Sequence, residues 1–353
     1  MFIRSDLILL GISTVVVVLS GLAHYGQWNG GVAFALAAIA IAALASLVGR
    51  SVDQLGDSLG PGATGVLQSA LGNLPELFIC LFALKNGLVE VVQAALIGSI
   101  LGNLLLVMGL AFVVGGLRHG TQKIDSVRAR TISVLLMVSV VAMVLPSFTR
   151  VVHTPAMRHE HELSVLASIV LLALFALTLP ASIRRQHSTG LAEGPKQEPP
   201  RWPLALAVGM LAVAGVLAAF VSDWFVVALE PAMNAWGVSD AFAGLVIVAL
   251  AGNAIENVVG IQLAARNQSD YAFQVIINSP LQIALVLAPA LVILSTLLGF
   301  TALTLVFSPI LIIAVFLAVL IAAIITIDGA SDWIEGAALI GVYIVIAAAF
   351  WWG

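Results

Sequence analysis

Long apolar runs, separated by short polar breaks, follow one another along the whole chain. They cover residues 6–25, 30–49, 62–85, 89–116, 127–147, 161–181, 203–222, 240–265, 271–298, 303–327 and 332–352. Because an α-helix rises about 1.5 Å per residue, a run of about 20 residues crosses a hydrocarbon layer about 30 Å thick. The pattern therefore predicts eleven transmembrane helices. A second interpretation makes two of them longer, bent helices, 30–58 and 203–232, with amphipathic ends.

The composition supports a membrane protein. Hydrophobic residues make up 61% of the 353 residues and charged residues only 9%, whereas a soluble domain carries about 25% charged residues. So few charges cannot cover a soluble surface, so we expect an all-α integral membrane protein with the lipid bilayer as its surroundings. The single cysteine, Cys80, excludes an internal disulfide.

The positive charges predict the orientation of the chain. If the N-terminus is cytoplasmic, eleven Lys and Arg residues fall in cytoplasmic segments, and three, Lys85, Arg150 and Arg158, fall outside. The positive-inside rule therefore favours a cytoplasmic N-terminus and, with eleven spans, a C-terminus on the outer side. We expect the protein in the cell membrane, either a plasma membrane or a bacterial inner membrane.

The most polar stretch, RRQHSTGLAEGPKQEPPR at 184–201, contains three prolines, two glycines and six charges without periodicity. This composition is typical of a flexible linker. It divides the chain into a leading helix at 1–29, five helices in 30–183, a cytoplasmic linker at 184–202 and five helices in 203–353.

A short motif occurs in both halves. GNLPELFICL at 72–81 and GNAIENVVGI at 252–261 share Gly, Asn and Glu at the same spacing, 180 positions apart. The same offset aligns, without a gap, Ile97, Ser99, Leu101 and Leu105 with Ile277, Ser279, Leu281 and Leu285. Because each half contains an odd number of helices, the second half must enter the membrane in the opposite direction. The sequence therefore predicts two inverted-topology repeats, with an ion site near the bilayer midplane.

The repeated motif brings oxygen ligands to membrane depth. Asn73 and Glu76 share one helix face, Pro75 releases a backbone carbonyl, and Gly72 allows close approach of another group. Hard cations such as Ca²⁺ prefer roughly six to eight oxygen ligands. The candidate ligands are the glutamates Glu76 and Glu256, with Gly72, Asn73, Gly252, Asn253, Ser99, Ser279 and Gln282 around them. A structural clasp is the alternative role for the glutamates, and helix packing is the alternative for the asparagines and serines.

Two carboxylates at one buried site also predict exchange. The two carboxylates cannot both remain ionised without a bound cation, because they would repel each other in a medium of low polarity. Either a divalent cation or protons must neutralise them, so each species expels the other. We therefore expect a proton-driven Ca²⁺ antiporter, with exchange of Na⁺, K⁺ or Mn²⁺ for H⁺ as the nearest alternative. A cation channel, and an intramembrane enzyme that uses the glutamates as acid and base, are further alternatives.

Several function classes have no support in the sequence. We find no nucleotide-binding loop, no nucleophile–base pair and no basic patch for nucleic acid. The chain is therefore expected to be no enzyme, to need no cofactor and to bind no nucleic acid. Its expected substrates are Ca²⁺ and protons.

The two motif regions resemble a known family. GNLPELFICLFALKNGLVEVVQAALIGSILGNLLLVMG and GNAIENVVGIQLAARNQSDYAFQVIINSPLQIALVLAP are similar to the two repeats of the Ca²⁺/H⁺ exchangers, a branch of the calcium/cation antiporter superfamily. The C-terminal DGASDWIEGAALIGVYIVIAAAFWW is similar to the end of these proteins, so the resemblance extends from about residue 45 to the end. It implies eleven helices, alternating access, and Ca²⁺ bound by Glu76 and Glu256 on the third and eighth helices.

Departures from this family include two in the second repeat. Asn257 stands where the family usually has a histidine, and Asn278-Ser279-Pro280 stands where it usually has Gly-Ser-Ser. Because histidine titrates near neutral pH and asparagine does not, the pH response is expected to differ from that of its relatives.

Overall fold

The structure is a computed structural model that describes residues 3–59, 71–188 and 201–352. Within these ranges, the side chains of residues 57, 179–188, 255 and 256 lie outside the description. The chain divides into two compact units. Unit 1 comprises residues 1–83 and 173–237, and unit 2 comprises residues 84–172 and 238–353.

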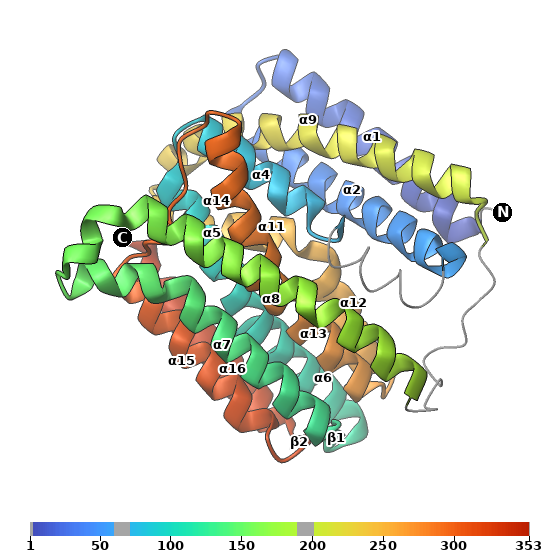
Figure 1. Cartoon of the computed structure of the whole chain (residues 1–353). Coiled ribbons are helices and arrows are strands. Elements are labelled where there is room, and N and C mark those ends of the chain that lie inside the picture. The colour runs from blue at the N-terminus through green and yellow to red at the C-terminus, as the bar shows by residue number, and fades with distance from the viewer. Residues whose placement is uncertain (1–2, 60–70, 189–200, 353) are drawn as a thin grey trace. The chain divides into compact units, whose positions relative to one another are not determined.

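Unit 1 is built from long helices. They are α1 (Arg4–Tyr25), α2 (Gly30–Leu59), α4 (Leu74–Lys85) up to Ala83, the end of α8 (Glu160–Ser188) and α9 (Leu204–Trp236). Figure 1 shows α1, α2 and α9 side by side. Alanines along α2, such as Ala37 and Ala40, are buried, and Phe34 meets Phe225 of α9 with ring centroids 4.7 Å apart. Small side chains let apolar helices approach closely.

One end of unit 1 is held by a group of polar contacts, which we call the Asp6 clasp. Asp6 is only 2% exposed; its carboxylate accepts hydrogen bonds from Arg50 Nη1 at 3.1 Å and from Trp202 Nε1 at 3.3 Å. The side-chain oxygen of Gln54 accepts the backbone N–H groups of Arg201 and Trp202. The last two residues of the predicted linker are therefore fixed to α2.

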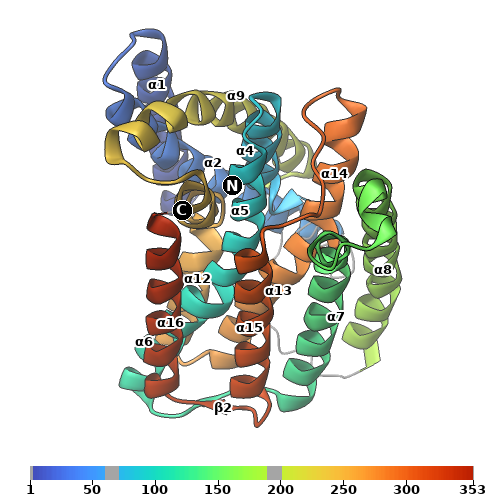
Figure 2. The same ribbon diagram turned by 90° about the vertical axis from the view of Figure 1, so that its left-hand side faces the viewer.

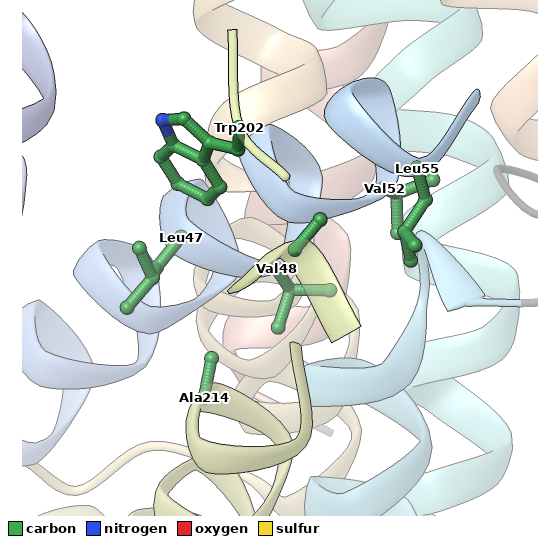
Figure 3. Packing of buried hydrophobic residues seen from close by; sticks show 7 residues of the cluster. Leu47, Val48, Val52, Leu55, Trp202 and Ala214 are labelled. Atoms are coloured by element: carbon green, nitrogen blue, oxygen red, sulfur yellow. The ribbon is translucent and has the colours of Figure 1, made fainter. Parts of the chain in front are cut away.

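The same clasp explains the length of α2. Figure 3 shows Trp202 beside Leu47 and Val48, with Val52 and Leu55 further along α2. The apolar face thus continues past residue 49, and Arg50 has a carboxylate partner. The predicted end at residue 49 was therefore wrong, as was the end of 203–222, because α9 continues to Trp236. The greater length given by the second interpretation agrees with both helices.

Unit 2 contains the remaining elements. They are α5 (Val89–Leu101), the π-helix η1 (Gly102–Val107), α6 (Met108–His119), β1 (Gln122–Lys123), α7 (Ser126–Val151), the 3₁₀-helix η2 (Pro155–His159), the start of α8, α10 (Asp240–Phe242), the π-helix η3 (Ala243–Val248), α11 (Ala249–Gly252), α12 (Ala254–Ala265), α13 (Ser269–Gln282), the π-helix η4 (Ile283–Leu287), α14 (Ala288–Leu297), α15 (Pro309–Thr326), β2 (Ala330–Ser331) and α16 (Trp333–Trp351).

Close helix packing and one short strand pair organise unit 2. The helices α6 and α16 cross where Gly109 and Gly336 bring their backbones together, and a Cβ on either glycine would meet the other's carbonyl oxygen at 2.6–2.7 Å. β1 and β2 pair antiparallel at the end of this bundle, as Figures 1 and 2 show. Asp332 caps α16 by accepting the backbone N–H groups of Ile334 and Glu335.

Element boundaries recur at the offset found in the sequence. The ranges 74–85 of α4 and 254–265 of α12 are 180 positions apart. The starts of α5 and α13, and of α6 and α14, are separated by the same number. The π-helices η1 and η4 both end at matching positions, 107 and 287. The ungapped sequence match therefore corresponds to matching local structure.

Fewer than the eleven predicted spans can be counted within the described residues. Among the described residues, nine helices are long and apolar enough to cross a membrane, and ten if Asp240–Gly252 and Asn257–Ala265, bent by 62°, form one span. The predicted span 62–85 includes residues 62–70, which lie outside the description.

The predicted span 303–327 was wrong at its start, because the helix α15 begins only at Pro309. Side chains of Ser147, Ser164 and Gln93 bond the backbone of residues 304–307 and replace helical hydrogen bonds there.

Candidate functional site

Helix α5 is positioned in unit 2 by direct backbone contact. A Cβ on Gly98 would meet the carbonyl oxygen of Leu245 in the π-helix η3, and a Cβ on Gly244 would meet the carbonyl oxygen of Val91. The glycines therefore let two helices approach more closely than any other residue would allow. Ser99 follows Gly98 and is brought by this contact towards the end of α11.

The helix after η3 is interrupted at Asn253. This residue has φ −106° and ψ 20°, and it stands between the end of α11 and the start of α12. Its Nδ2 donates to Ser99 Oγ at 2.9 Å and to the carbonyl oxygen of Ala249 at 3.0 Å. Its Oδ1 accepts a hydrogen bond from Ser279 Oγ at 3.3 Å. Asn253 thus connects three helical segments of unit 2.

A further amide joins the same group. Asn103 lies in the π-helix η1, where its Nδ2 donates to the carbonyl oxygen of Ser99 at 2.9 Å and to Ser279 Oγ at 3.2 Å. Ser99, Asn103, Asn253 and Ser279 are each at most 3% exposed. We call these four residues the polar cluster.

A narrow recess adjoins the polar cluster. It is lined by Gly98, Ser99, Gly102, Asn103, Ala249, Leu250, Asn253 and Asn257. The Oδ1 atoms of Asn103 and Asn257 are buried and accept no hydrogen bond within the part of the chain that the structure describes. A buried amide oxygen without a donor is costly, and both oxygens are hard ligands of the kind that Ca²⁺ accepts.

Asn103 was not among the predicted site residues. The repeat comparison could not find it, because the position 180 residues later is Ile283. One signal was present in the sequence: Asn103 is an amide in an apolar run and follows Ser99 by four residues, which places both on one helix face.

The first motif belongs to unit 1. Gly72 and Asn73 form a turn immediately before α4, and Pro75 lies in the first turn of that helix. A proline is accommodated there, because the first N–H groups of a helix have no helical acceptor. Glu76 is the third residue of α4 and its side chain is fully buried; Asn73 is 9% exposed.

The second motif has the same backbone arrangement. Gly252 ends α11, and Glu256 is the third residue of α12, as Glu76 is of α4. The side chain of Glu256 lies outside the described residues. The predicted meeting of Glu76 and Glu256 therefore also lies outside the description and stays a prediction. Gln282 is the last residue of α13, three positions after Ser279.

The predicted residues are therefore brought together in part. Within unit 2, Asn253 is hydrogen-bonded to both Ser99 and Ser279. Asn103 is hydrogen-bonded to Ser279 as well. No three His, Cys, Asp or Glu side chains converge as a metal site among residues whose side chains are described. The cluster itself therefore offers amide and hydroxyl oxygens rather than carboxylates.

Long apolar helices, a broken helix and polar side chains buried at the break define a membrane transport protein. The chain belongs to the sodium/calcium exchanger family, because the family model described as sodium/calcium exchanger protein matches residues 29–184 and 206–352.

Individual relatives agree with this membership. A Ca²⁺/H⁺ antiporter of Aphanothece halophytica is 36% identical over 350 residues, covering 94% of this chain and 93% of that protein. The Ca²⁺/H⁺ antiporter ChaA of Bacillus subtilis (strain 168) is 37% identical over 327 residues, covering 92% and 93%. The solved structure of native YfkE matches with a TM-score of 0.82 and 34% identity over 97% of this chain and 99% of that one.

These matches confirm the resemblance to Ca²⁺/H⁺ exchangers that the sequence motifs indicated. The relatives are named as antiporters, which confirms that the chain belongs to a class of transporters and not of enzymes.

Proposed function

We propose that this protein is a proton-driven secondary antiporter that exports Ca²⁺ in exchange for H⁺. The observation that carries the proposal is the bonding of Asn253, at a helix break, to Ser99 and Ser279 on two other helices. Interrupted helices of this kind hold the ion sites of many secondary transporters. The relatives named Ca²⁺/H⁺ antiporters indicate the substrates, Ca²⁺ and protons. The proton gradient supplies the energy, so no cofactor is needed.

The proposed architecture has eleven spans, one leading helix in 1–29 and two inverted five-helix repeats in 30–183 and 203–353. The equal boundaries of α4 and α12, 180 positions apart, support the repeat. Inverted repeats favour alternating access, because exchanging the conformations of the two halves opens the same site to the opposite side. The charge distribution supports a cytoplasmic N-terminus and linker, with the C-terminus outside.

In the proposed site, Glu76 and Glu256 bind the cation or the protons. Both are third residues of a helix that starts after a break, where the helix dipole favours a negative charge. Asn253, Ser99 and Ser279 surround them, and Asn103 adds an amide oxygen that has no hydrogen-bond donor among the described residues. The other proposed contributors are Gly72, Asn73, Gly252 and Gln282.

Charge balance then couples the two substrates. Ca²⁺ neutralises both carboxylates, and protons neutralise them in its absence. The empty site with two charges is strongly disfavoured at membrane depth. The site therefore changes the side of the membrane to which it opens only when it holds Ca²⁺ or protons. This requirement makes the protein an exchanger and prevents uncoupled ion leak.

Reconstitution in liposomes tests the proposal. With a pH gradient imposed, uptake of ⁴⁵Ca²⁺ should follow the proton gradient and should be lost in Glu76→Gln and Glu256→Gln. Glu162→Gln is the matched control, because the Glu162 side chain is 70% exposed at the start of α8.

Other outcomes select other functions. Calcium flux that follows membrane voltage without a proton gradient indicates a channel. Transport of Na⁺, K⁺ or Mn²⁺, but not Ca²⁺, against protons indicates an exchanger of the same fold for another cation. Both results would contradict the proposed function.

A further inference from the structure

Two residues outside the proposed site each tie one site-bearing helix to a connection in the other half of the chain. Gln93 lies in α5, which carries Ser99, and Asp270 lies in α13, which carries Ser279. We propose that Gln93 and Asp270 are positioning residues for the cation site, each fixing its helix along the helix axis. This inference rests on the proposed function and concerns how the same site is held.

The Gln93 tether reaches the connection between α14 and α15. The side-chain Nε2 of Gln93 donates to the carbonyl oxygens of Thr304 and Val306, both at 3.0 Å. Both N–H groups of the amide are therefore used on one segment. Gln93 precedes Ser99 by six residues, or about 9 Å along the helix, so a shift of the tether moves the serine.

The segment that Gln93 binds is held from its other edge. Ser147 Oγ of α7 donates to the carbonyl oxygen of Leu305 and accepts the N–H of Phe307, both at 2.9 Å. Ser164 Oγ of α8 accepts the N–H of Leu305 at 2.9 Å. These bonds alternate between two edges as in a β-strand, with side chains in the place of neighbouring strands. The segment is thus a fixed anchor for α5.

The Asp270 tether reaches the connection between α6 and α7. Asp270 Oδ1 accepts the backbone N–H of Asp125 at 3.0 Å, and Oδ2 accepts a hydrogen bond from Gln274 at 2.6 Å. Asp125 in turn caps α7 by accepting the N–H groups of Val127 and Arg128. The β1–β2 pair holds the same connection, so this end of α13 also has a fixed anchor.

The connections that the two tethers bind are at corresponding places in the repeat, although Gln93 itself aligns with Phe273 and Asp270 with Glu90. The connections that they bind follow α6 and α14, whose starts are 180 positions apart. Each connection begins near a glycine with positive φ, Gly120 at 76° and Gly299 at 70°. Figure 2 shows α14 and β2 at opposite ends of unit 2. The first-half helix α5 is therefore held by a connection in the second half, and the second-half helix α13 by a connection in the first half. The two anchors lie at opposite ends of unit 2.

This crossed arrangement has a consequence for the site. The Ser99 hydroxyl must meet Asn253 Nδ2 at 2.9 Å, and the Ser279 hydroxyl must meet Asn253 Oδ1 at 3.3 Å. Axial movement of α5 or α13 breaks these contacts without removing any ligand. Loss of a tether should therefore weaken cation binding and leave the chemistry of exchange in place.

The test compares half-saturating Ca²⁺ concentrations in reconstituted liposomes. Gln93→Met keeps the side-chain length and removes both donors, and Asp270→Ala removes the acceptor. Each should raise the half-saturating concentration about tenfold, the range found when groups that orient metal ligands are removed, with the maximal rate within about twofold of wild type. Asp270→Asn keeps an acceptor oxygen and should restore near wild-type binding.

Controls separate positioning from general structural support. Gln262→Met makes the same chemical change at an exposed position of α12 and should change neither parameter. A purely structural role would lower the melting temperature and the maximal rate and leave the half-saturating concentration unchanged. That result in Gln93→Met or Asp270→Ala would overturn the inference. Gln93→Asn, with a shorter amide, is the second variant if Gln93→Met does not fold.

Asn253→Ala distinguishes this inference from the proposed function. If N253A loses exchange and Q93M has an unchanged half-saturating Ca²⁺ concentration, only the positioning role of the tethers is overturned. Wild-type exchange by N253A overturns the proposed site, and the tethers with it.

Discussion

The side-chain nitrogen of Asn253 donates a hydrogen bond to the hydroxyl oxygen of Ser99 over 2.9 Å. Asn253 stands at the break between α11 and α12, and Ser99 lies 154 positions earlier, in α5. Both side chains are buried, so the bond forms where water cannot replace it. This contact joins the second G-N-x-x-E motif to the helix that follows the first one.

Removing the amide of Asn253 should therefore affect both stability and transport. Asn253→Ala leaves the hydroxyls of Ser99 and Ser279 without this partner, at a cost of about 1–3 kcal/mol in the free energy of unfolding. We expect Ca²⁺ uptake into liposomes to fall at least about tenfold. Asn278→Ala, one residue before Ser279, is the matched control and should retain uptake. Wild-type uptake and stability in N253A would contradict this role.

Asn103 provides a test of a residue that the repeat comparison missed. Asn103→Leu keeps the number and branching of the side-chain heavy atoms and removes the buried oxygen beside the recess, together with the two hydrogen bonds that Nδ2 donates. If that oxygen contributes to cation binding, the half-saturating Ca²⁺ concentration should rise about tenfold. Asn234→Leu, at an exposed position of α9, should leave it unchanged. An unchanged value in N103L would assign Asn103 to helix packing alone.

The glycine contact between α5 and η3 predicts a steric effect. Gly98→Ala places a methyl group against the carbonyl of Leu245, and Gly244→Ala places one against that of Val91. Overpacking of this kind costs about 1–3 kcal/mol, so both variants should melt at a lower temperature and transport more slowly. Gly341→Ala in α16 has open space at its Cβ and should be neutral or slightly stabilising. Equal melting temperatures for G98A and G341A would disprove the backbone contact.

The Asp6 clasp predicts a coupled loss of stability in unit 1. Removing one partner of a buried ion pair costs about 3–5 kcal/mol. The Arg50 side chain is 30% exposed, so solvent screens part of this energy, and we expect about 1–3 kcal/mol for Asp6→Asn. In a double-mutant cycle with Trp202→Phe, the two losses should not add, because both remove hydrogen bonds to the same carboxylate. Additive losses in thermal unfolding would show that the contacts act independently.

Much of the helical fold could be predicted from apolar runs, because membrane-spanning helices must satisfy their own backbone hydrogen bonds. The closeness of Asn253, Ser99 and Ser279 could also be expected, since the repeated motifs led us to place all three around one ion site.

Other features depend on partners far apart in the chain. The length of α2 depends on the pairing of Arg50 with Asp6, 44 positions away, and no local pattern indicates that pairing. The non-helical start of the predicted span 303–327 depends on Gln93, more than 200 positions away, together with serines of other helices. Asn103 lacks a counterpart because the repeat has Ile283 there, so internal symmetry could not reveal it.

In the proposed mechanism, Ca²⁺ and protons compete for the same pair of carboxylates, Glu76 and Glu256. Calorimetric titration of the purified protein with Ca²⁺, in buffers of different ionisation enthalpy at one pH, measures the protons released per cation bound. Competition for the carboxylates predicts proton release at a pH where the empty site is protonated, with less release in Glu76→Gln and Glu256→Gln. Tight Ca²⁺ binding with the same heat in every buffer would contradict it.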